Sequence, residues 1–452
     1  MTTSDSDPLD LTRLSTLATR ALDAAVKAGA DSADAVVLSG RSLSATVRNG
    51  AIEEAEQSEG TDVGLRVFVG ARSASVSVGP AANLAEAADR AVAMARAAPE
   101  DDSQAIAPAD LLLRDAPADL DINDPTAPTM EELIARSNAL EAAMLDVAGV
   151  TNSGGVSASS SHAGRAMATT NGFAGAYSTS THGHSATAIA GDGTKMERDH
   201  WSSVRRHLAD LLPVEDVGRL AAERTVRRLG AEPLSTRTAT IIFEPRTASG
   251  FVRHLLSAIS GSAVARRASF LAGRTGELVY PAGITVRDDP TVRRGMSSRP
   301  FDGEGLATAP IDFVQDGILT DYILDLQAAR KLGLAGNGRA ARGTGSPSPS
   351  PTNISVHGGA GDLAALMESA GTGLLVTDLI GMGANIINGN YSRGAAGFWF
   401  ENGEIVKPVT EITIAGELGA MFRRAVFGDD APGLYSVDAP TVLLEGMTIG
   451  GR

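Results

Sequence analysis

The amino-acid sequence predicts an α+β protein, in which N-terminal domains of helices and antiparallel sheet are followed by a β-rich C-terminal domain. Two observations carry this prediction. Up to Gly230, segments with helical spacing of apolar residues alternate with segments of strict apolar–polar alternation. After Glu232-Pro233 the chain changes to many short apolar runs, separated by glycine, asparagine and aspartate. From these changes we expect domains at residues 1–100, 101–232 and 233–452.

Four segments of the first two domains have the pattern of amphipathic helices. Residues 11–29 place Leu14, Leu17 and Ala21 at helical spacing and end at Gly29, a residue type that favours the end of a helix. The other three segments are residues 83–98, 129–145 and 214–230.

Strands are predicted between these helices. Asn49-Gly50 lies between two alternating runs, which is a strong signal for a hairpin. Residues 149–201 are rich in serine, threonine, glycine and alanine and alternate in the same way, so we expect a second antiparallel sheet there. In the C-terminal part, the glycine- and proline-rich stretch 343–353 is expected to form a long flexible loop.

Charge and composition limit the classes of function. The chain of 452 residues carries a net charge of -15, from 39 lysines and arginines against 54 acidic residues. A duplex-binding surface needs clustered basic residues, so we expect no direct nucleic-acid binding. The chain contains no cysteine, which excludes disulfides and thiolate zinc ligands. The segment Met1 to Arg13 lacks the apolar core of a signal peptide, and no long apolar run is present, so we expect a cytoplasmic protein without a membrane span.

Two histidines are candidates for a metal-binding pair. His182 and His184 are separated by one glycine, so on a strand they share one face, and two imidazoles at that spacing can chelate a metal. The favoured alternative is that both are polar residues of an exposed or cleft-facing strand, because no third ligand follows nearby. His254 lies in a predicted helix, but Leu255 follows it where a metallopeptidase helix needs glutamate, so no zinc site is expected there.

The sequence indicates no other catalytic centre. The acidic pairs Asp288-Asp289 and Asp302 with Glu304 lie near glycine and proline, which is typical of turns. The glycine-rich stretch 383–397 allows close backbone approach, so an extended peptide could pair with it as with the edge of a sheet.

Several motifs point to one known family. Residues 383–405 read GANIINGNYSRGAAGFWFENGEI and are followed by PVTEITIAG at 408–416. RNGAIEEAE and GLRVFVG come near the start of the chain, and SAISGSAVARRASFLAG and RPFDGEGLAT come after residue 250. Together these segments resemble the TldD/PmbA family, in its PmbA (TldE) branch, and the resemblance extends over nearly the whole chain.

The resemblance implies a complex of TldD and TldE that acts as a zinc metallopeptidase on unfolded or flexible peptides. The family is linked to maturation of a peptide antibiotic, to degradation of an antitoxin and, by name, to DNA gyrase. Its TldD branch carries an H-E-x-x-x-H helix and a later cysteine as zinc ligands. The matching window here places Arg253, His254 and Ala258 at those three positions. We therefore expect no metal in this chain, zinc in a TldD-type partner, and no catalysis by this chain alone.

The resemblance also suggests residues that line a peptide channel or contact a partner subunit: Asn385, Tyr391, Ser392, Arg393 and Trp399. As a large aromatic residue, Trp399 is expected either in the core or as an interface anchor. The expected partners are the TldD-type subunit and an unfolded or extended peptide, and self-association of the chain alone is left open. Two other functions stay open as well. One is a non-proteolytic regulator, for example of gyrase or of a toxin–antitoxin pair, and the other is an independent hydrolase that uses His182 and His184.

Overall fold

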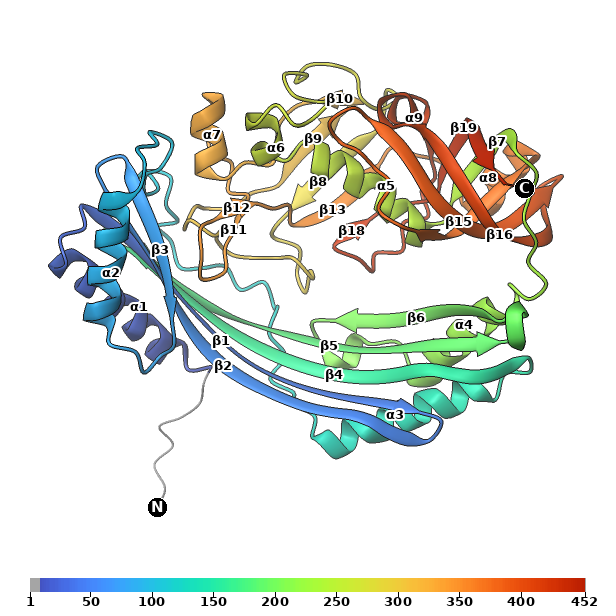
Figure 1. Ribbon diagram of the computed structural model, residues 1–452, viewed down its shortest axis with the longest axis horizontal. Coiled ribbons are helices and arrows are strands. Elements are labelled where there is room, and N and C mark those ends of the chain that lie inside the picture. Colours follow the sequence, from blue (N-terminus) through green and yellow to red (C-terminus); the bar gives the residue numbers. More distant parts are fainter. Residues whose placement is uncertain (1–8, 452) are drawn as a thin grey trace.

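The computed structural model describes residues 9–451 and consists of two lobes that face each other (Figure 1). The N-terminal lobe contains one six-stranded antiparallel sheet, whose concave face is turned towards the C-terminal lobe. Of the segment Met1 to Arg13, which was predicted not to be a signal peptide, residues 1–8 lie outside the described part. Within residues 9–451, no helix has the length and apolarity needed to cross a membrane.

The N-terminal lobe follows the order helix, strands, helix, twice along the chain. The first set is α1 (Leu11–Lys27), β1 (Ser32–Arg48), β2 (Ala51–Val69), β3 (Arg72–Val78) and α2 (Leu84–Ala97). The second set is α3 (Met130–Leu145), β4 (Val150–Thr169), β5 (Ala174–Ala190), β6 (Glu197–Arg205) and α4 (Val214–Val226). The helices α1 and α2 bury their apolar faces against one end of the sheet, and α3 and α4 bury theirs against the other end.

Side-chain caps explain where the predicted helices begin. Asp10 accepts hydrogen bonds from the first backbone amides of α1, and Asn83 does the same for α2. Thr129 and Glu132 form a capping box at the start of α3. The hairpin prediction is confirmed, because Asn49 and Gly50 have φ of 52° and 75° and connect the antiparallel strands β1 and β2.

The prediction of a second, separate sheet at residues 149–201 is wrong. The six strands form one sheet in the order β3-β2-β1-β4-β5-β6, because β4 pairs with β1 over almost its whole length. Apolar–polar alternation identifies the two faces of a strand, whereas the partner at each hydrogen-bonding edge has no signal in the local sequence. The domain boundaries given above stay predictions.

The C-terminal lobe contains a barrel and a second sheet. The strands of the first sheet follow the order β16-β15-β14-β7-β19-β17, and an additional pairing of β16 with β19 closes five of them into a barrel. The second sheet has the order β10-β9-β8-β13-β18. Helix α5 (Pro245–Ala258) contacts strands of both, and its apolar face belongs to the main core of this lobe.

The remaining elements of this lobe are short. The strands are β7 (Arg237–Phe243), β8 (Thr285–Asp289), β9 (Ile311–Gln315), β10 (Ile318–Leu319), β11 (Ala340–Ala341), β12 (Ser348–Pro349), β13 (Asn353–His357), β14 (Thr372–Ile380), β15 (Asn390–Glu401), β16 (Glu404–Glu417), β17 (Val426–Phe427), β18 (Val437–Asp438) and β19 (Val442–Gly450). The helices are α6 (Gly261–Ala265), α7 (Leu326–Leu332), α8 (Leu363–Ala370) and α9 (Leu418–Arg424).

The glycine-rich stretch 383–397 does not offer a free sheet edge, so the expectation that a peptide pairs with it is wrong. Its strand part belongs to β15, which pairs with β14 on one side and with β16 on the other. The glycines allow close packing instead. A Cβ atom on Gly397 would lie 1.9 Å from the carbonyl oxygen of Leu375, so only glycine fits there.

A buried group of charges joins the two lobes at the N-terminal end of the sheet. Asp34 of β1 accepts a hydrogen bond from Arg66 Nε at 2.9 Å and another from Arg342 of the C-terminal lobe. Glu304, also of the C-terminal lobe, lies 4.0 Å from Arg66 Nη2. All four side chains are at most 5% exposed. The lobes are therefore joined here by ion pairs shielded from water.

The stretch 343–353 packs against this part of the sheet, instead of forming the free loop predicted. A Cβ atom on Gly64 of β2 would lie 2.3 Å from the carbonyl oxygen of Thr344, so the two backbones touch. Within the stretch, β12 pairs with β11. The composition rich in glycine, proline and serine correctly indicated irregular backbone but gave no sign of the contact with the sheet.

A second charged contact joins the lobes near the other end of the sheet. Asp199 of β6 accepts hydrogen bonds from both Nη atoms of Arg246 of α5, at 2.8 and 3.2 Å. Arg224 of α4 and Arg228, which follows this helix, lie 3.6 and 3.7 Å from the same carboxylate. The Asp199 side chain is 3% exposed and contacts all three guanidinium groups, which also pair with Glu244, Glu197 and Asp378 around it.

Replacing this carboxylate tests how strongly it stabilises the fold. We expect Asp199→Asn to lower the free energy of unfolding by about 3 kcal/mol, because loss of one partner leaves buried charges uncompensated. Chemical denaturation monitored by circular dichroism measures this change. Asp216→Asn is the matched control, since Asp216 pairs with Arg219 on the exposed side of α4, and its effect should be about 0.5 kcal/mol or less. An Asp199→Asn protein as stable as the control would contradict this account.

The buried Glu304 makes stability depend on pH. Burial and the neighbouring Asp302 raise the pKa of Glu304 to about 8. Between its ordinary pKa of 4.5 and this value, the folded chain keeps a proton that the unfolded chain has lost, so the free energy of unfolding falls as pH rises through this window. Glu304→Gln removes the titration and keeps an acceptor for the backbone amide of Leu326.

We therefore expect Glu304→Gln to gain on the order of 2 kcal/mol relative to the unmodified chain between pH 5 and pH 8. Denaturation curves at a series of pH values measure the difference. Glu277→Gln serves as control, because the Glu277 side chain is 58% exposed and its removal should leave the pH dependence unchanged. If the free energy of unfolding changed with pH in the same way for Glu304→Gln and the unmodified chain, the raised pKa would not belong to Glu304.

Candidate functional site

Helix α5 presents the window that resembles the metal-binding helix of the zinc-bearing branch. The helix begins with Pro245, which suits the first helical position, and its apolar face fixes its rotation against the core. His254 is half-buried, and its ring meets that of Tyr391 edge-on, with ring centroids 5.7 Å apart. Burial and the positive charge of Arg393 lower the pKa of His254 to about 4. The imidazole is therefore neutral at pH 7.

The residues of this window do not fit a zinc ion. Arg253 is exposed and cationic, and Ala258 is fully buried and has no donor atom. This leaves His254 as a single imidazole beside the guanidinium group of Arg393, whereas zinc sites use three or four ligands. Across residues 9–451, no group of three or more His, Cys, Asp or Glu side chains is arranged to hold a metal ion. No catalytic step through a metal follows for this chain.

The structure brings together only part of the predicted channel or interface set. Tyr391 is 3% exposed and lies against His254, with Arg393 close by. Asn385 and Ser392 are exposed, the first in the loop before β15 and the second on β15 itself. Arg393 is half-buried and donates a hydrogen bond from Nη2 to the carbonyl oxygen of Leu379 at 3.2 Å.

Trp399 lies apart from these residues, towards the other end of β15. It is 7% exposed and belongs to the main core of the C-terminal lobe. Its Nε1 donates a hydrogen bond to Glu401 at 2.9 Å, and the guanidinium of Arg237 lies 5.3 Å from its ring centroid. Trp399 was expected either in the core or at a subunit interface, and within this chain its side chain is buried in the core.

His182 and His184 share one face of β5, but that face is buried, with exposures of 0% and 3%. The expectation of an exposed or cleft-facing strand is therefore wrong for both residues. His182 Nδ1 shares a hydrogen bond with Ser160 Oγ at 3.1 Å, and its Nε2 lies 3.6 Å from a carboxylate oxygen of Asp124. Burial lowers the pKa of both histidines, which favours the neutral form. Alanine neighbours on the same strand pack under α3 and α4, so this is a covered face of the sheet.

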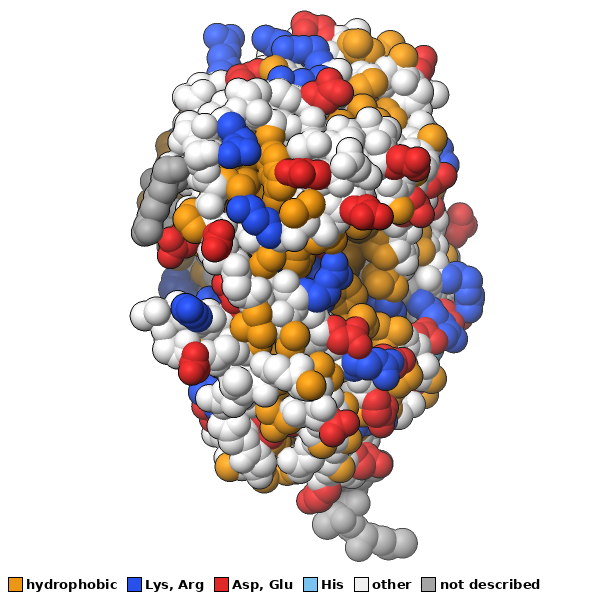
Figure 2. Space-filling model, turned by 90° about the vertical axis from the view of Figure 1, so that its right-hand side faces the viewer, with side chains coloured by type: hydrophobic (Ala, Val, Ile, Leu, Met, Phe, Trp, Pro, Cys, Tyr) orange, Lys and Arg blue, Asp and Glu red, His pale blue; other side chains and the backbone are white. Residues whose placement is uncertain are grey.

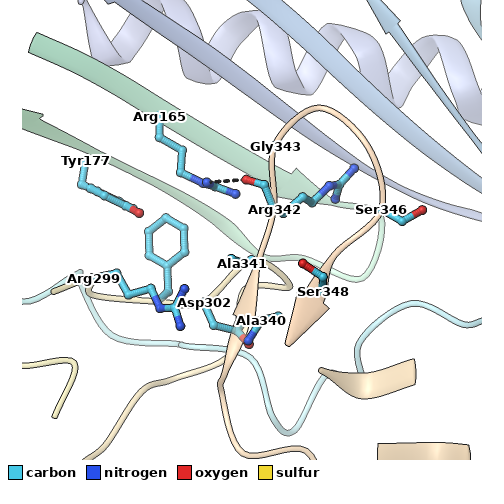
Figure 3. A pocket seen from close by; sticks show the side chains of 12 residues that line it. Arg165, Tyr177, Arg299, Asp302, Ala340, Ala341, Arg342, Gly343, Ser346 and Ser348 are labelled. Atoms are coloured by element: carbon cyan, nitrogen blue, oxygen red, sulfur yellow. Dashed lines mark hydrogen bonds between the residues drawn. The ribbon is translucent and has the colours of Figure 1, made fainter. Parts of the chain in front are cut away.

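The space between the lobes holds charged side chains that the sequence analysis missed. Two adjoining hollows of about 230 and 420 Å³ are both lined by Arg165 of β4, Tyr177 of β5 and Arg299 (Figure 3). Asp302 and Glu304, interpreted as turn residues, are buried at 2% and 3% exposure beside them. One local signal could have pointed here, because a charged residue inside an apolar strand, such as Arg66 in GLRVFVG, needs a buried partner.

A third hollow opens where α4 meets the barrel. The space-filling view of this side shows a depression between the lobes, with apolar and basic side chains around it (Figure 2). A cavity of about 100 Å³ at this junction is lined by Arg227, Met367, Phe398 and Ile405, among others. The guanidinium of Arg227 lies 5.0 Å from the ring centroid of Phe398, and Asp199, Arg224 and Glu244 also line this cavity.

Comparison with known proteins agrees with the resemblance seen in the sequence. Three family models match: PmbA/TldA metallopeptidase domain 1 at residues 33–95, the central domain at 123–229 and the C-terminal domain at 236–451. The chain is 36% identical over 427 residues to the metalloprotease PmbA of Escherichia coli O157:H7, covering 93% of each chain. It is 34% identical to the metalloprotease PmbA homologue of Haemophilus influenzae, covering 96% of this chain and 95% of the relative.

Solved structures share the fold. A protein described as a modulator of DNA gyrase from Bacteroides thetaiotaomicron superposes with a TM-score of 0.89 at 24% identity, covering 97% of this chain and 98% of that one. TldE from Thermococcus kodakarensis superposes with a TM-score of 0.82 at 20% identity, covering 96% and 100%. With the family models matching most of the length and the PmbA relatives aligned nearly from end to end, the chain belongs to the TldD/PmbA family, in its PmbA (TldE) branch.

Proposed function

We propose that this chain is the metal-free subunit of a zinc-dependent peptidase, and that it needs a TldD-type subunit to support cleavage of unfolded peptides. The observation that carries the proposal is the window on α5, where Arg253, His254 and Ala258 offer a single neutral imidazole beside cationic groups. Its relatives are named metalloproteases. A subunit that completes an active site in another chain reconciles that name with a window that does not fit zinc.

The contribution of this chain would be to hold an extended peptide between the lobes. The concave face of the sheet and the inner side of the C-terminal lobe face each other across this space (Figure 1). Among the described strands β6 pairs with β5 alone, so its outer edge is open to strand addition. At one end side chains already occupy the backbone groups of that edge. The amide of Asp199 donates a hydrogen bond to Thr225 Oγ1, and the carbonyl oxygen of His200 accepts one from Arg246 Nη1. The half from Trp201 to Val204 is the part left for a peptide.

A reconstitution assay tests the proposal. The chain, a TldD-type partner loaded with zinc, and their mixture are each incubated with an unstructured peptide, and products are identified by mass spectrometry. We expect cleavage in the mixture, with at least about a hundredfold less in either protein alone, which corresponds to about 3 kcal/mol of activation free energy. A partner that cleaves at full rate without this chain would refute the proposal. In that case, stable binding to a protein target, independent of the partner's zinc ligands, would support a regulator instead.

Zinc content gives an independent test. After equilibration with excess zinc and dialysis, we expect the isolated chain to retain well under one zinc ion per molecule by inductively coupled plasma mass spectrometry, because the α5 window provides too few ligands. The double variant His182→Ala/His184→Ala should give the same value. One zinc ion per chain, lost in the double variant, would point to an independent hydrolase that uses the histidine pair.

A further inference from the structure

The interlobe hollows contain guanidinium groups that lack counterions, unlike the fully buried arginines near them. Arg66 and Arg342 are paired with Asp34, and Arg339 is paired with Asp288. Arg165 and Arg299 have no carboxylate within ion-pair distance in the described part of the chain, and neither has Arg206, which is 9% exposed. Arg165 and Arg299 are half-buried and Arg206 is buried. Withdrawing a cation from water without a counterion is costly, so three such groups lining adjoining hollows call for an explanation.

The hydrogen bonds of all three arginines are made to neutral groups, and those of Arg165 and Arg299 leave donors unused. Arg165 Nη1 donates to the carbonyl oxygen of Arg342 at 2.8 Å (Figure 3), and Arg299 Nη2 donates to that of Ser350 at 2.8 Å. Within residues 9–451, the buried atoms Arg165 Nη2, Arg299 Nε and Arg342 Nη2 have no hydrogen-bond acceptor. Burial also lowers the pKa of Arg299, because withdrawing its charge from water disfavours the protonated form. Backbone carbonyls therefore hold these side chains in place without neutralising them.

The remaining lining is compatible with a bound anion. In the smaller hollow the one carboxylate among the lining residues is Asp302, whose oxygens accept hydrogen bonds from the backbone amides of Glu304, Leu306 and Ala340. Burial raises the pKa of Asp302, which favours its neutral form, so Asp302 neutralises the arginines only weakly. Tyr177, Ser346 and Ser348 add hydroxyl groups around the hollow. A carboxylate matches both the charge and the paired donors of a guanidinium.

We propose that Arg165 and Arg299 bind a carboxylate group of an extended peptide in the space between the lobes, either its free C-terminus or an acidic side chain. The adjoining hollow, lined by Leu38, Ser39, Thr179 and Arg206, gives the rest of such a chain room to lie along the concave face of the sheet. This proposal rests on the proposed function in so far as the ligand is a peptide, and it adds which chemical group this chain recognises.

Peptide binding to the full chain, measured by fluorescence anisotropy, tests the proposal. Three labelled peptides of the same neutral sequence are used: one with a free C-terminus, one amidated, and one amidated with an added glutamate. We expect a carboxylate at either place to lower the dissociation constant about tenfold relative to the neutral amidated peptide. This ratio of dissociation constants, compared between the two charged peptides, shows whether the C-terminal or the side-chain carboxylate is preferred. Arg165→Gln/Arg299→Gln should abolish this ratio. Arg13→Gln/Arg90→Gln, which removes two exposed charges from α1 and α2, should preserve it.

The conservative variant Arg165→Lys/Arg299→Lys guards against misfolding, since it keeps the charge and should retain part of the ratio. A ratio unchanged in Arg165→Gln/Arg299→Gln, or a ratio near one in the unmodified chain, would overturn the proposal. So would inorganic phosphate that binds more tightly than any of the peptides. Cleavage of the neutral amidated peptide by the reconstituted complex is scored separately, so the proposed function can stand when this carboxylate site fails.

Discussion

The arrangement of the two lobes depends on a buried carboxylate, Asp34, held between two arginines from different lobes. Arg66 belongs to the neighbouring strand β2, whereas Arg342 of the C-terminal lobe follows directly after β11. Asp34 and Arg66 belong to neighbouring strands of the N-terminal lobe and pair with each other there, whereas the pair of Asp34 with Arg342 exists only while both lobes are in place. The attraction is strong because the site is shielded, and for the same reason the loss of any partner is costly.

The second contact, around Asp199, anchors the opposite end of the sheet to α5. Two such contacts fix the distance and the angle between the lobes, whereas one would allow them to rotate. The geometry of the space between them is therefore set by buried ion pairs, by close backbone contacts such as that at Gly64, and by an apolar contact. The two main cores each lie within one lobe, and a smaller buried cluster, in which Phe173 and Tyr177 meet the ring of Phe301 edge-on, joins the lobes. Such a construction leaves room for polar side chains that face the hollow.

The local elements could be predicted from sequence because their causes are local. The caps at Asp10, Asn83 and Thr129 and the turn at Asn49-Gly50 act within a few residues. The turn was predicted from its residue types, and the helices were predicted from the spacing of their apolar residues. The pairing of β4 with β1 was missed, since it depends on which edges meet in space. Residues 303 and 304 do form the turn that was predicted there, but the burial of Glu304 beside Arg66 was missed, since Arg66 lies far away in the sequence. Family resemblance supplied the α5 window, and the structure added that His254 is neutral and lies beside Arg393.

Charge distribution gives the interlobe space a character different from that of the chain as a whole. With a net charge of -15, the molecule repels anions at long range, and this repulsion is screened by physiological salt beyond about 8 Å. Arg165, Arg206 and Arg299 act only at short range, inside hollows that a folded protein or a nucleic-acid duplex is too wide to enter. An extended chain carrying a single carboxylate is narrow enough, and it loses little to the weak outer repulsion. Placing uncompensated cations inside an acidic molecule therefore selects for flexible peptides and against bulky polyanions, which is consistent with the function proposed for this subunit.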